Sequence, residues 1–442
     1  GPLYTLLKAA TAIARAREAT EAGYDTVPVF WMATEDHDFA EIAHVELADA
    51  RELNGLKTVS IGPAPEPPVS VGGIRPGTQI ESALAEAEGV LGAGEVMTLL
   101  RDVYRPDVTL AESFGSLMAR LFAPWGLIVM DAAGGEFHAL GAKVLEAAIR
   151  DADALHTALI ERDRLLTDRG YQPQVKVAAN SSLLFLLDER TGARLPLRRI
   201  RQGNGPEWKA GARRFSPDEL CTILQVSPER FSPNALLRPV FQDAILPTSA
   251  YIGGPAEIAY FAQTEVAYRA ILGRSTAVLP RLSATLLESK IATAMARHEL
   301  ALPDAWTTKD ALAQRMGARA LPIEGKRKLA AAGNSLDREL TAVTEWMAAM
   351  DVELGRSAIT AASKMRYQMN RLRRLAARHQ AEKETSLARH ALAISQAVYP
   401  GGHLQERVVG GIHFLATQGT GLLGRLVQAA ADACPGHRLL PL

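Results

Sequence analysis

Residues 27–39 read VPVFWMATEDHDF, and this stretch decides the fold. Residues 27–33 are an apolar run rich in residues that favour β-strands, which predicts a short buried strand. Residues 34–38 are all polar, and a helical pattern begins directly after them at Phe39. In open α/β sheets, ligands bind beyond the carboxyl ends of the strands, so these polar residues stand where a functional site is expected.

The elements on either side of this stretch continue an α/β pattern. Strand-like runs and amphipathic helical patterns alternate over most of residues 1–297. One strand-like run, residues 126–131, ends in Asp131, which places another carboxylate at a strand end. We expect helices at 6–22, 39–47, 79–91, 95–103, 110–121, 255–272 and 285–297, and strands at 57–61, 126–131, 248–252 and 276–279.

Two regions break this alternation. Residues 183–188 and 194–199 flank the turn residues 189–192, which predicts an antiparallel hairpin inside an inserted subdomain. Further on, apolar residues spaced four and three apart form a heptad seam, which predicts a coiled coil. A helix of roughly sixty residues is about 90 Å long at 1.5 Å per residue, so it must pair with another helix. The seam consists of Leu336, Leu340, Val343, Met347, Met350 and Leu354, continued by Met365, Met369, Leu372 and Ala376.

These patterns predict an α/β core built on a doubly wound parallel sheet, followed by a C-terminal α-helical coiled coil. The expected domains are 1–164 for the first part of the core, 165–232 for the inserted subdomain with its β-hairpin, 233–330 for the second part of the core, 331–398 for the coiled-coil helices and 399–442 for a C-terminal helical segment packing back on the core.

Composition narrows the function classes. The 442 residues are enough for two or three domains. Lys and Arg total 49, as do Asp and Glu, and no long basic block is present, so nucleic acid is not an expected partner. No apolar run is long enough to span a bilayer. Cys221 and Cys434 are too far apart in sequence for a paired-thiolate metal motif, and they suit a reducing compartment, so we expect a cytoplasmic protein.

Five segments carry a family resemblance: GPLYT at 1–5, PVFWMATEDHDF at 28–39, LRP at 237–239, YIGGPAE at 251–257 and LQER at 404–407. In this order, along nearly the whole chain, they resemble the cysteine-adding family of bacillithiol biosynthesis. The resemblance implies a Rossmann-like core with connecting insertions and a coiled coil that forms a homodimer. The family has residues before the segment that corresponds to 1–5, so we expect further residues to precede Gly1.

The resemblance also implies an activity: a ligase that adds cysteine to glucosamine-malate to form bacillithiol. The cysteine carboxyl then acylates the sugar amine, so the sugar ammonium must first lose a proton. His37 is the expected base, with Asp36 or Asp38 orienting it. The structural alternative is that acids at the start of a helix only interact favourably with its dipole.

A metal site competes for the same residues. His37, His44, Asp36 and Asp38 are acceptable ligands, but their spacing matches no recognised zinc pattern. We therefore expect no tightly bound metal, whereas magnesium carried by a nucleotide is compatible with the sequence.

The resembling segments supply most candidate substrate-binding residues. Arg238 stands in an apolar run and either pairs in the core or anchors the malate carboxylates. Gly253 and Gly254 let the backbone approach a ligand, or form an ordinary turn. Asn180 offers hydrogen bonds to sugar hydroxyls, or belongs to a turn. The full set is Tyr4, Lys8, Trp31, Glu35, Asn180, Arg238, Tyr251, Gly253, Gly254 and Glu257.

In the resembling family a nucleotide can sit between the core and the coiled coil, so ATP or ADP with Mg²⁺ is the expected cofactor. The candidate residues are Arg281, Ser283, Gln405 and Arg407, although Ser283 is equally a candidate helix N-cap. Two other functions stay open: a catalytically inactive coiled-coil dimer that binds a nucleotide or small molecule, and a metal-dependent hydrolase of a sugar amide.

Overall fold

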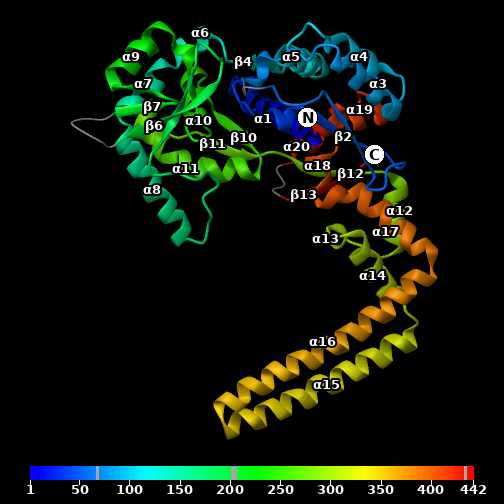
Figure 1. The fold of residues 1–442 in the computed structure, drawn as a ribbon. Coiled ribbons are helices and arrows are strands. Elements are labelled where there is room, and N and C mark those ends of the chain that lie inside the picture. Colours follow the sequence, from blue (N-terminus) through cyan, green and yellow to red (C-terminus); the bar gives the residue numbers. More distant parts are fainter. Residues whose placement is uncertain (66–68, 201–206, 433–435) are drawn as a thin grey trace. The chain divides into compact units, whose positions relative to one another are not determined.

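The computed structural model describes residues 1–65, 69–200, 207–432 and 436–442. Two compact units make up the chain (Figure 1). Unit 1 comprises Gly1–Leu47, Lys57–Ser283 and Gly410–His437. Unit 2 comprises Ala48–Leu56, Ala284–Val409 and Arg438–Leu442.

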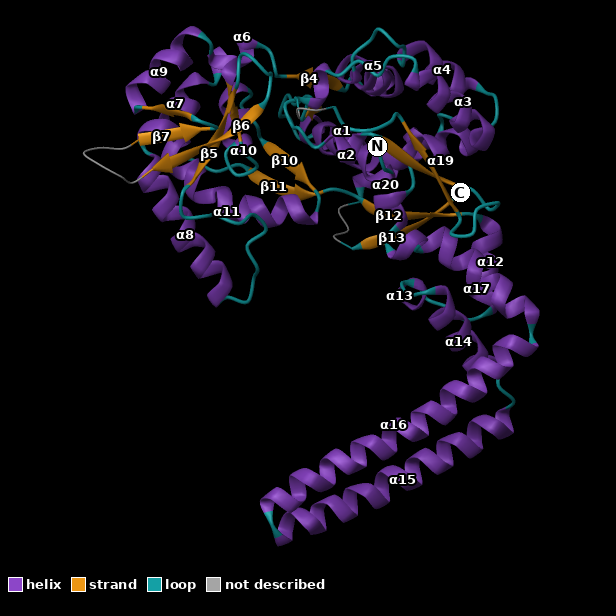
Figure 2. Cartoon of the chain, viewed as in Figure 1, coloured by secondary structure: helices purple, strands orange, loops and turns teal. Residues whose placement is uncertain are grey.

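Parallel strand pairs form the part of unit 1 that positions the site. Strand β1 (Val29–Met32) pairs with β4 (Ile128–Asp131), and β10 (Ala250–Gly253) pairs with β11 (Ala277–Pro280). Helix α11 (Pro255–Leu272) connects β10 to β11, so these three elements follow one another as in a βαβ unit. Among the described residues the two pairs are separate two-stranded sheets (Figure 2).

The helix predicted over residues 39–47 is wrong. Helix α2 spans only Phe39–Ile42, and residues 44–48 form strand β2 (His44–Ala48), which pairs with β3 (Leu56–Ser60). Along β2, His44 is exposed and Leu47 is fully buried. Over so short a stretch, apolar residues at helical spacing also fit a strand, and here the pairing with β3 prevails.

An antiparallel sheet forms the second part of unit 1, in the order β8-β7-β6-β5-β9. The predicted hairpin is confirmed by the pairing of β5 (Ser181–Leu187) with β6 (Arg194–Ile200). In its turn, Gly192 has a φ of 69°, a backbone conformation that favours glycine. The remaining strands are β7 (Glu207–Ala210), β8 (Arg213–Phe215) and β9 (Phe231–Pro233).

Helices cover this sheet and complete unit 1. Trp208, Phe231 and Phe241 are among its largest buried side chains. The predicted helices at 79–91, 95–103 and 110–121 are confirmed as α3 (Gln79–Leu91), α4 (Glu95–Val103) and α5 (Leu110–Phe122). The other helices of unit 1 are α1 (Leu3–Glu21), α6 (Gly135–Leu140), α7 (Ala142–Arg150), α8 (Ala152–Asp168), α9 (Pro217–Val226), α10 (Arg238–Ile245), α19 (Gly411–Gln418) and α20 (Leu422–Ala431).

Unit 2 is mainly helical. Strands β12 (Ser283–Leu287) and β13 (His437–Pro441) form a small sheet, most of whose residues belong to this unit. The helix predicted over residues 285–297 therefore begins only at Ser289, because its first residues lie in β12. Its helices include α12 (Ser289–Arg297), α13 (Leu302–Ala305), α14 (Lys309–Ala320), α17 (Thr385–Val398) and α18 (Gln405–Val408).

The heptad seam does not run along one continuous helix, so that expectation is wrong. Helix α15 (Ile323–Met350) ends before Asp351, whose backbone is extended, and α16 (Val352–Lys383) then folds back along α15 (Figure 1). Asp351 caps α16 by accepting hydrogen bonds from the backbone N–H groups of Glu353 and Leu354. The expected partner helix therefore comes from the same chain.

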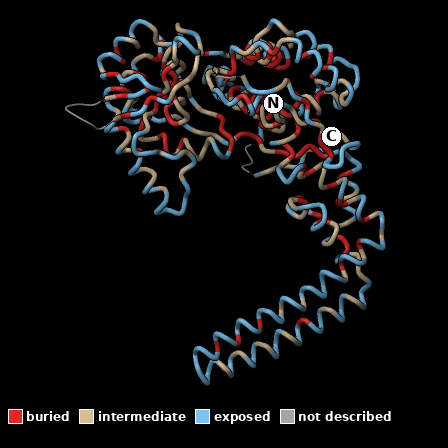
Figure 3. The backbone as a smooth tube through the Cα atoms, viewed as in Figure 1, coloured by how far each residue is buried: buried red, intermediate tan, exposed pale blue. Residues whose placement is uncertain are grey.

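Only part of the seam is covered by this hairpin. Figure 3 shows that most residues of the α15–α16 hairpin are exposed. The α16 residues that are buried are small, among them Gly355, Ala358 and Ala362. A Cβ at Gly355 would lie 2.7 Å from Cβ of Ala348, so this glycine permits the close approach of the two helices near their connection. Several larger seam residues are exposed: Val343, Met350, Leu354, Met365 and Leu372.

Two observations complete the fold. Within the described residues, no helix combines the length and the apolar character that crossing a membrane requires. Cys221 is a free, buried thiol on α9, whereas Cys434 lies outside the described residues.

Candidate functional site

The polar residues after β1 lie at the carboxyl end of a parallel strand pair. Met32 and Asp131 are partners in the register of β1 and β4. One residue after Ala33, the Thr34 hydroxyl donates a hydrogen bond to Asp131 Oδ1 over 2.5 Å. The loop at 34–38 therefore lies just beyond β1 and is hydrogen-bonded to the last residue of β4. Ligands of α/β proteins commonly bind at such strand ends.

Asp36 is held by two arginines that the chain brings from distant elements. Arg238 at the start of α10 contacts Asp36 Oδ1 through Nη2 over 2.6 Å. Arg194 on β6 contacts the same oxygen through Nη1 over 3.3 Å. The structure thus brings the predicted residues Asp36 and Arg238 together, and it adds Arg194, which the sequence did not suggest.

Arg194 also fixes His37. Its Nη1 lies 3.3 Å from His37 Nδ1, and its guanidinium stacks 3.9 Å from the centre of the Phe185 ring. A guanidinium only donates hydrogen bonds, so His37 Nδ1 must accept, and the neutral ring then carries its proton on Nε2. Further donation to Ser232 Oγ (2.7 Å) and the Pro233 carbonyl (3.0 Å) secures Arg194, whose side chain is only 6% exposed.

Asp38 has a local structural contact. Its Oδ1 accepts a hydrogen bond from Glu41 N over 3.3 Å, which makes it the N-cap of α2. For Asp38 the structure therefore agrees with the structural alternative, in which an acid at the start of a helix only stabilises that helix.

Glu35 pairs with a histidine that the sequence did not suggest. His138 on α6 is completely buried, and its Nε2 lies 2.9 Å from Glu35 Oε1. The two atoms are in ion-pair contact, although the N–H bond is not aligned as a hydrogen bond requires. Burial disfavours the charged ring, but Glu35, the Gly134 carbonyl and Glu229 outweigh it and raise the pKa of His138 above its ordinary value.

A second cluster joins α1 to the first turn of α11. Lys8 Nζ lies 2.5 Å from Glu257 Oε1 and 3.2 Å from the Tyr251 hydroxyl, and that hydroxyl donates to the same carboxylate over 2.6 Å. Burial lowers the pKa of Lys8; Glu257 counteracts this, while Arg281 and Arg238 lower it further. The charge of Arg238 thus acts on both clusters.

The carboxylate of this cluster stays ionised. Burial alone raises the pKa of Glu257, but Lys8 and hydrogen bonds from Gly254 N and Tyr251 bring it below its ordinary value. The Gly254 N–H donates to Glu257 Oε2 over 2.8 Å, so the Gly-Gly-Pro turn is locked onto the helix it begins.

Arg281 and Tyr4 border the same turn. Arg281 N donates to the Gly253 carbonyl over 2.9 Å, and the guanidinium lies 5.4 Å from the centre of the Tyr4 ring. A Cβ at Gly254 would lie 3.3 Å from Arg281 Nε, so there is little room for a side chain there.

Two predicted substrate residues lie apart from these contacts. Trp31 is partly buried against the core around Phe241. Asn180 is exposed just before β5, and its carbonyl accepts a hydrogen bond from Arg199 N over 3.0 Å. It lies at the opposite end of the β5–β6 hairpin from Arg194, roughly 20 Å away at about 3.3 Å per residue.

The four predicted nucleotide residues are divided between the units: Arg281 and Ser283 belong to unit 1, and Gln405 and Arg407 to unit 2. The Ser283 hydroxyl is hydrogen-bonded to His437 Nδ1 over 2.7 Å. The amide of Gln405 is buried and bonds to backbone groups of Leu286 and Ala397, whereas Arg407 is exposed.

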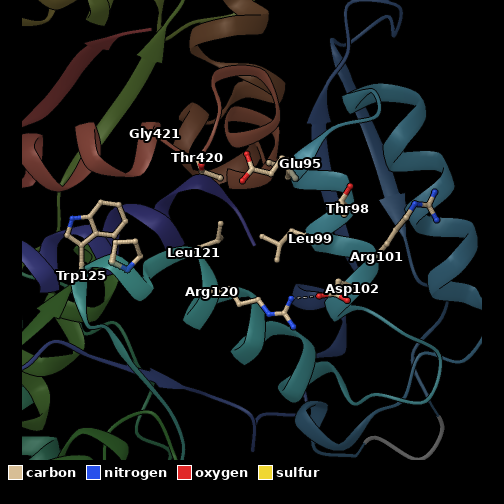
Figure 4. A pocket seen from close by; sticks show the side chains of 12 residues that line it. Glu95, Thr98, Leu99, Arg101, Asp102, Arg120, Leu121, Trp125, Thr420 and Gly421 are labelled. Atoms are coloured by element: carbon tan, nitrogen blue, oxygen red, sulfur yellow. Dashed lines mark hydrogen bonds and ion pairs between the residues drawn. The ribbon is translucent and has the colours of Figure 1, made fainter.

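A cavity of about 930 Å³ lies elsewhere on unit 1 (Figure 4). It is lined by α4, the end of α5 and the residues that precede α20, and Trp125 and Leu99 are among its apolar lining residues. None of the predicted site residues lines it. Arg120, one of its charged groups, is paired with Asp102. More charged groups converge around Asp36 at the end of β1 than in this cavity. We therefore take Asp36 and its neighbours Glu35, His37, Arg194 and Arg238 as the candidate reactive centre.

Comparison with known proteins gives two family matches. The profile described as "Bacillithiol biosynthesis BshC, N-terminal Rossmann-like domain" matches residues 1–282. The profile described as "Bacillithiol biosynthesis BshC, C-terminal coiled-coil domain" matches residues 284–442. Together they confirm the predicted fold class, a Rossmann-like core followed by a coiled coil.

Full-length relatives agree with these matches. A protein of Koribacter versatilis named as a cysteine ligase BshC is 40% identical over 441 residues, which cover 100% of this chain and 81% of that protein. Proteins of the same name from Solibacter usitatus and Salinibacter ruber are 36% and 29% identical, and each alignment covers 100% of this chain. The alignments cover 82% and 80% of those two proteins.

Proposed function

The chain belongs to the BshC family of bacillithiol biosynthesis, and from that premise we propose that it joins cysteine to glucosamine-malate through an amide bond. It is an enzyme of the cysteine ligase type. The observation that supports the proposed reaction best is the group around Asp36, where a second acid, a histidine and two arginines converge at the carboxyl end of a parallel strand pair.

Arg238 is the proposed anchor for malate. A guanidinium has five N–H donors, and the contact with Asp36 uses Nη2. The side chain is partly exposed, so donors are left for a bidentate contact with a carboxylate. Asp36 then serves to hold Arg238 in position, since its own Oδ1 is already occupied by two cations.

His37 is proposed to face the reacting carbonyl. With Nδ1 accepting from Arg194, the neutral imidazole presents Nε2–H, which can donate to the oxygen of the cysteinyl carboxyl group as the sugar amine attacks its carbon. To act as the base that the sequence suggested, the ring has to release the Arg194 contact first. In either role, loss of the imidazole is expected to abolish bacillithiol formation.

The carboxyl group of cysteine must be activated before an amine displaces its oxygen. We propose that a nucleoside triphosphate with Mg²⁺ supplies this activation, with Arg281 and Ser283 of unit 1 as candidate contacts. The exposed apolar residues of α15 and α16, such as Val343 and Met365, support the proposal of a homodimer formed through the coiled coil. A thiol product and free cysteine suit a reducing cytoplasm, which is the proposed location.

Reconstitution tests the proposal. Purified protein is incubated with labelled cysteine and glucosamine-malate, with Mg²⁺ and ATP, ADP or no nucleotide, and bacillithiol is detected by mass spectrometry. We expect product with wild type and none with His37→Ala, while His379→Ala, an exposed histidine on α16, retains activity.

Each other result points elsewhere. Binding of the substrates without product under every nucleotide condition overturns the ligase assignment and favours a small-molecule-binding dimer. Release of an amine from a sugar amide, abolished by chelation, favours the metal-dependent hydrolase.

A further inference from the structure

The three acids that follow β1 have different surroundings. Asp36 Oδ1 is shared by two guanidinium groups, and Asp38 caps α2. Among the described residues, Glu35 has one charged contact, from His138 Nε2 to Oε1, and its side chain is 24% exposed. Glu35 is therefore the acid of this loop best placed to meet a cation from solution through Oε2.

The hydrogen-bonding of His138 determines where its protons lie. Its Nδ1 lies 3.1 Å from the Gly134 carbonyl, which can only accept, so Nδ1 carries a proton. Its Nε2 faces the carboxylate of Glu35 at 2.9 Å. A bare lone pair on Nε2 would oppose a carboxylate in a fully buried position, so a second proton belongs on Nε2.

A doubly protonated His138 is a buried cation beside Glu35. Its other charged neighbour is Glu229, which also faces the start of α6, where a Cβ at Gly135 would lie 3.2 Å from Glu229 Oε2. The raised pKa of His138 agrees with this state. From the other side, Glu35 lies within electrostatic range of Arg194.

Resting on the proposed function, we propose that Glu35, oriented by His138, is the carboxylate that binds the primary ammonium group of a substrate. Glu35 then touches the substrate, and His138 is a positioning residue that acts through it. Cysteine and glucosamine-malate both carry such an ammonium group. The experiment below determines which of the two substrates Glu35 binds. Arg238 close by supplies the opposite charge that a zwitterionic substrate needs.

Calorimetric titration of the full chain tests the proposal without requiring turnover. Wild type, Glu35→Gln and His138→Gln are each titrated with cysteine and, separately, with glucosamine-malate. Glu136→Gln is the matched control, because Glu136 is an exposed acid on α6 close to His138 in sequence. Thermal melting of each variant checks that the fold is retained.

We expect Glu35→Gln to weaken binding of one of the two substrates tenfold or more, as loss of a charge-assisted hydrogen bond does. The substrate that is affected identifies the source of the ammonium group. Analogues that lack it, 3-mercaptopropionate for cysteine and the N-acetylated glycoside for glucosamine-malate, should bind wild type and Glu35→Gln equally. An equal loss for the analogue, or less than twofold loss for both substrates, overturns the proposal.

His138→Gln separates positioning from mere packing. In wild type the affinity for the ammonium substrate should fall as the pH rises through the pKa of His138, which is raised above its ordinary value, because a ring without the Nε2 proton no longer holds the carboxylate group of Glu35 in place. In His138→Gln the affinity should be lower than in wild type at low pH, and this part of the pH dependence should be absent, because glutamine does not titrate. A variant with unchanged pH dependence contradicts the role of His138. Ammonium-selective binding without bacillithiol in the reconstitution would refute the proposed function and leave this inference standing.

Discussion

Replacing Arg194 with methionine should reduce stability and activity together, because this one side chain fastens the inserted hairpin to the loop after β1. Methionine keeps most of the apolar stem, but it removes every donor and the guanidinium that stacks on the Phe185 ring. Asp36 keeps its contact with Arg238, so its carboxylate is not left without a cation.

The lost interactions set the magnitude. Arg194 donates to Ser232 and to the Pro233 carbonyl and pairs with Asp36. A hydrogen bond that involves a charged group contributes about 1.5–3 kcal/mol, and the guanidinium–aromatic contact about 0.5–2 kcal/mol. These contributions are not additive and are offset by the desolvation of the arginine, so the expected loss is about 2–4 kcal/mol. For a domain of this size that corresponds to roughly 3–8 °C in Tm.

Differential scanning fluorimetry and the bacillithiol assay measure the two effects. We expect kcat to fall roughly 10- to 100-fold, because His37 loses the contact that fixes its ring and tautomer. Arg198→Met is the matched control, since Arg198 is exposed on the same strand. If Arg194→Met melts and turns over like wild type, or if Arg198→Met shows the same losses, the claim that Arg194 fastens the loop is refuted.

Three further predictions follow from other contacts. Lys8→Met should lower stability by about 1–3 kcal/mol, a range reduced for side chains that are 27% and 26% exposed, and Lys8→Met combined with Glu257→Gln should recover part of the loss in thermal melting. The pKa of His138 is raised in the folded state, so the protonated ring stabilises the fold. This contribution is complete below the ordinary pKa of 6.5 and is lost as the pH rises through the raised pKa. His138→Gln should remove this part of the pH dependence of Tm. Asp351→Ala should destabilise the start of α16 by about 1 kcal/mol, which hydrogen exchange at Glu353 and Leu354 would detect as faster exchange, whereas unchanged exchange would contradict its capping role.

Much of the fold was readable because its signals are local. The apolar run before Thr34 predicts β1, the turn at 189–192 predicts the hairpin, and helical periodicity predicts α3, α4 and α5. Local signals also failed where two structures fit the same short pattern. Residues 44–48 have apolar residues at a spacing compatible with a helix, yet they pair with β3. The heptad seam continues past Asp351, yet that residue is a helix cap.

The site divides in the same way. By itself the sequence determined which acids and which histidine follow β1, because a strand end is recognisable from its neighbours in the chain. Only the tertiary structure decided what each of them does: Asp36 is occupied by arginines 158 and 202 residues away, and Glu35 faces His138 on a helix that follows β4. The physical reason is that an ion pair depends on distance and burial in space, and neither is encoded in the spacing of residues along the chain.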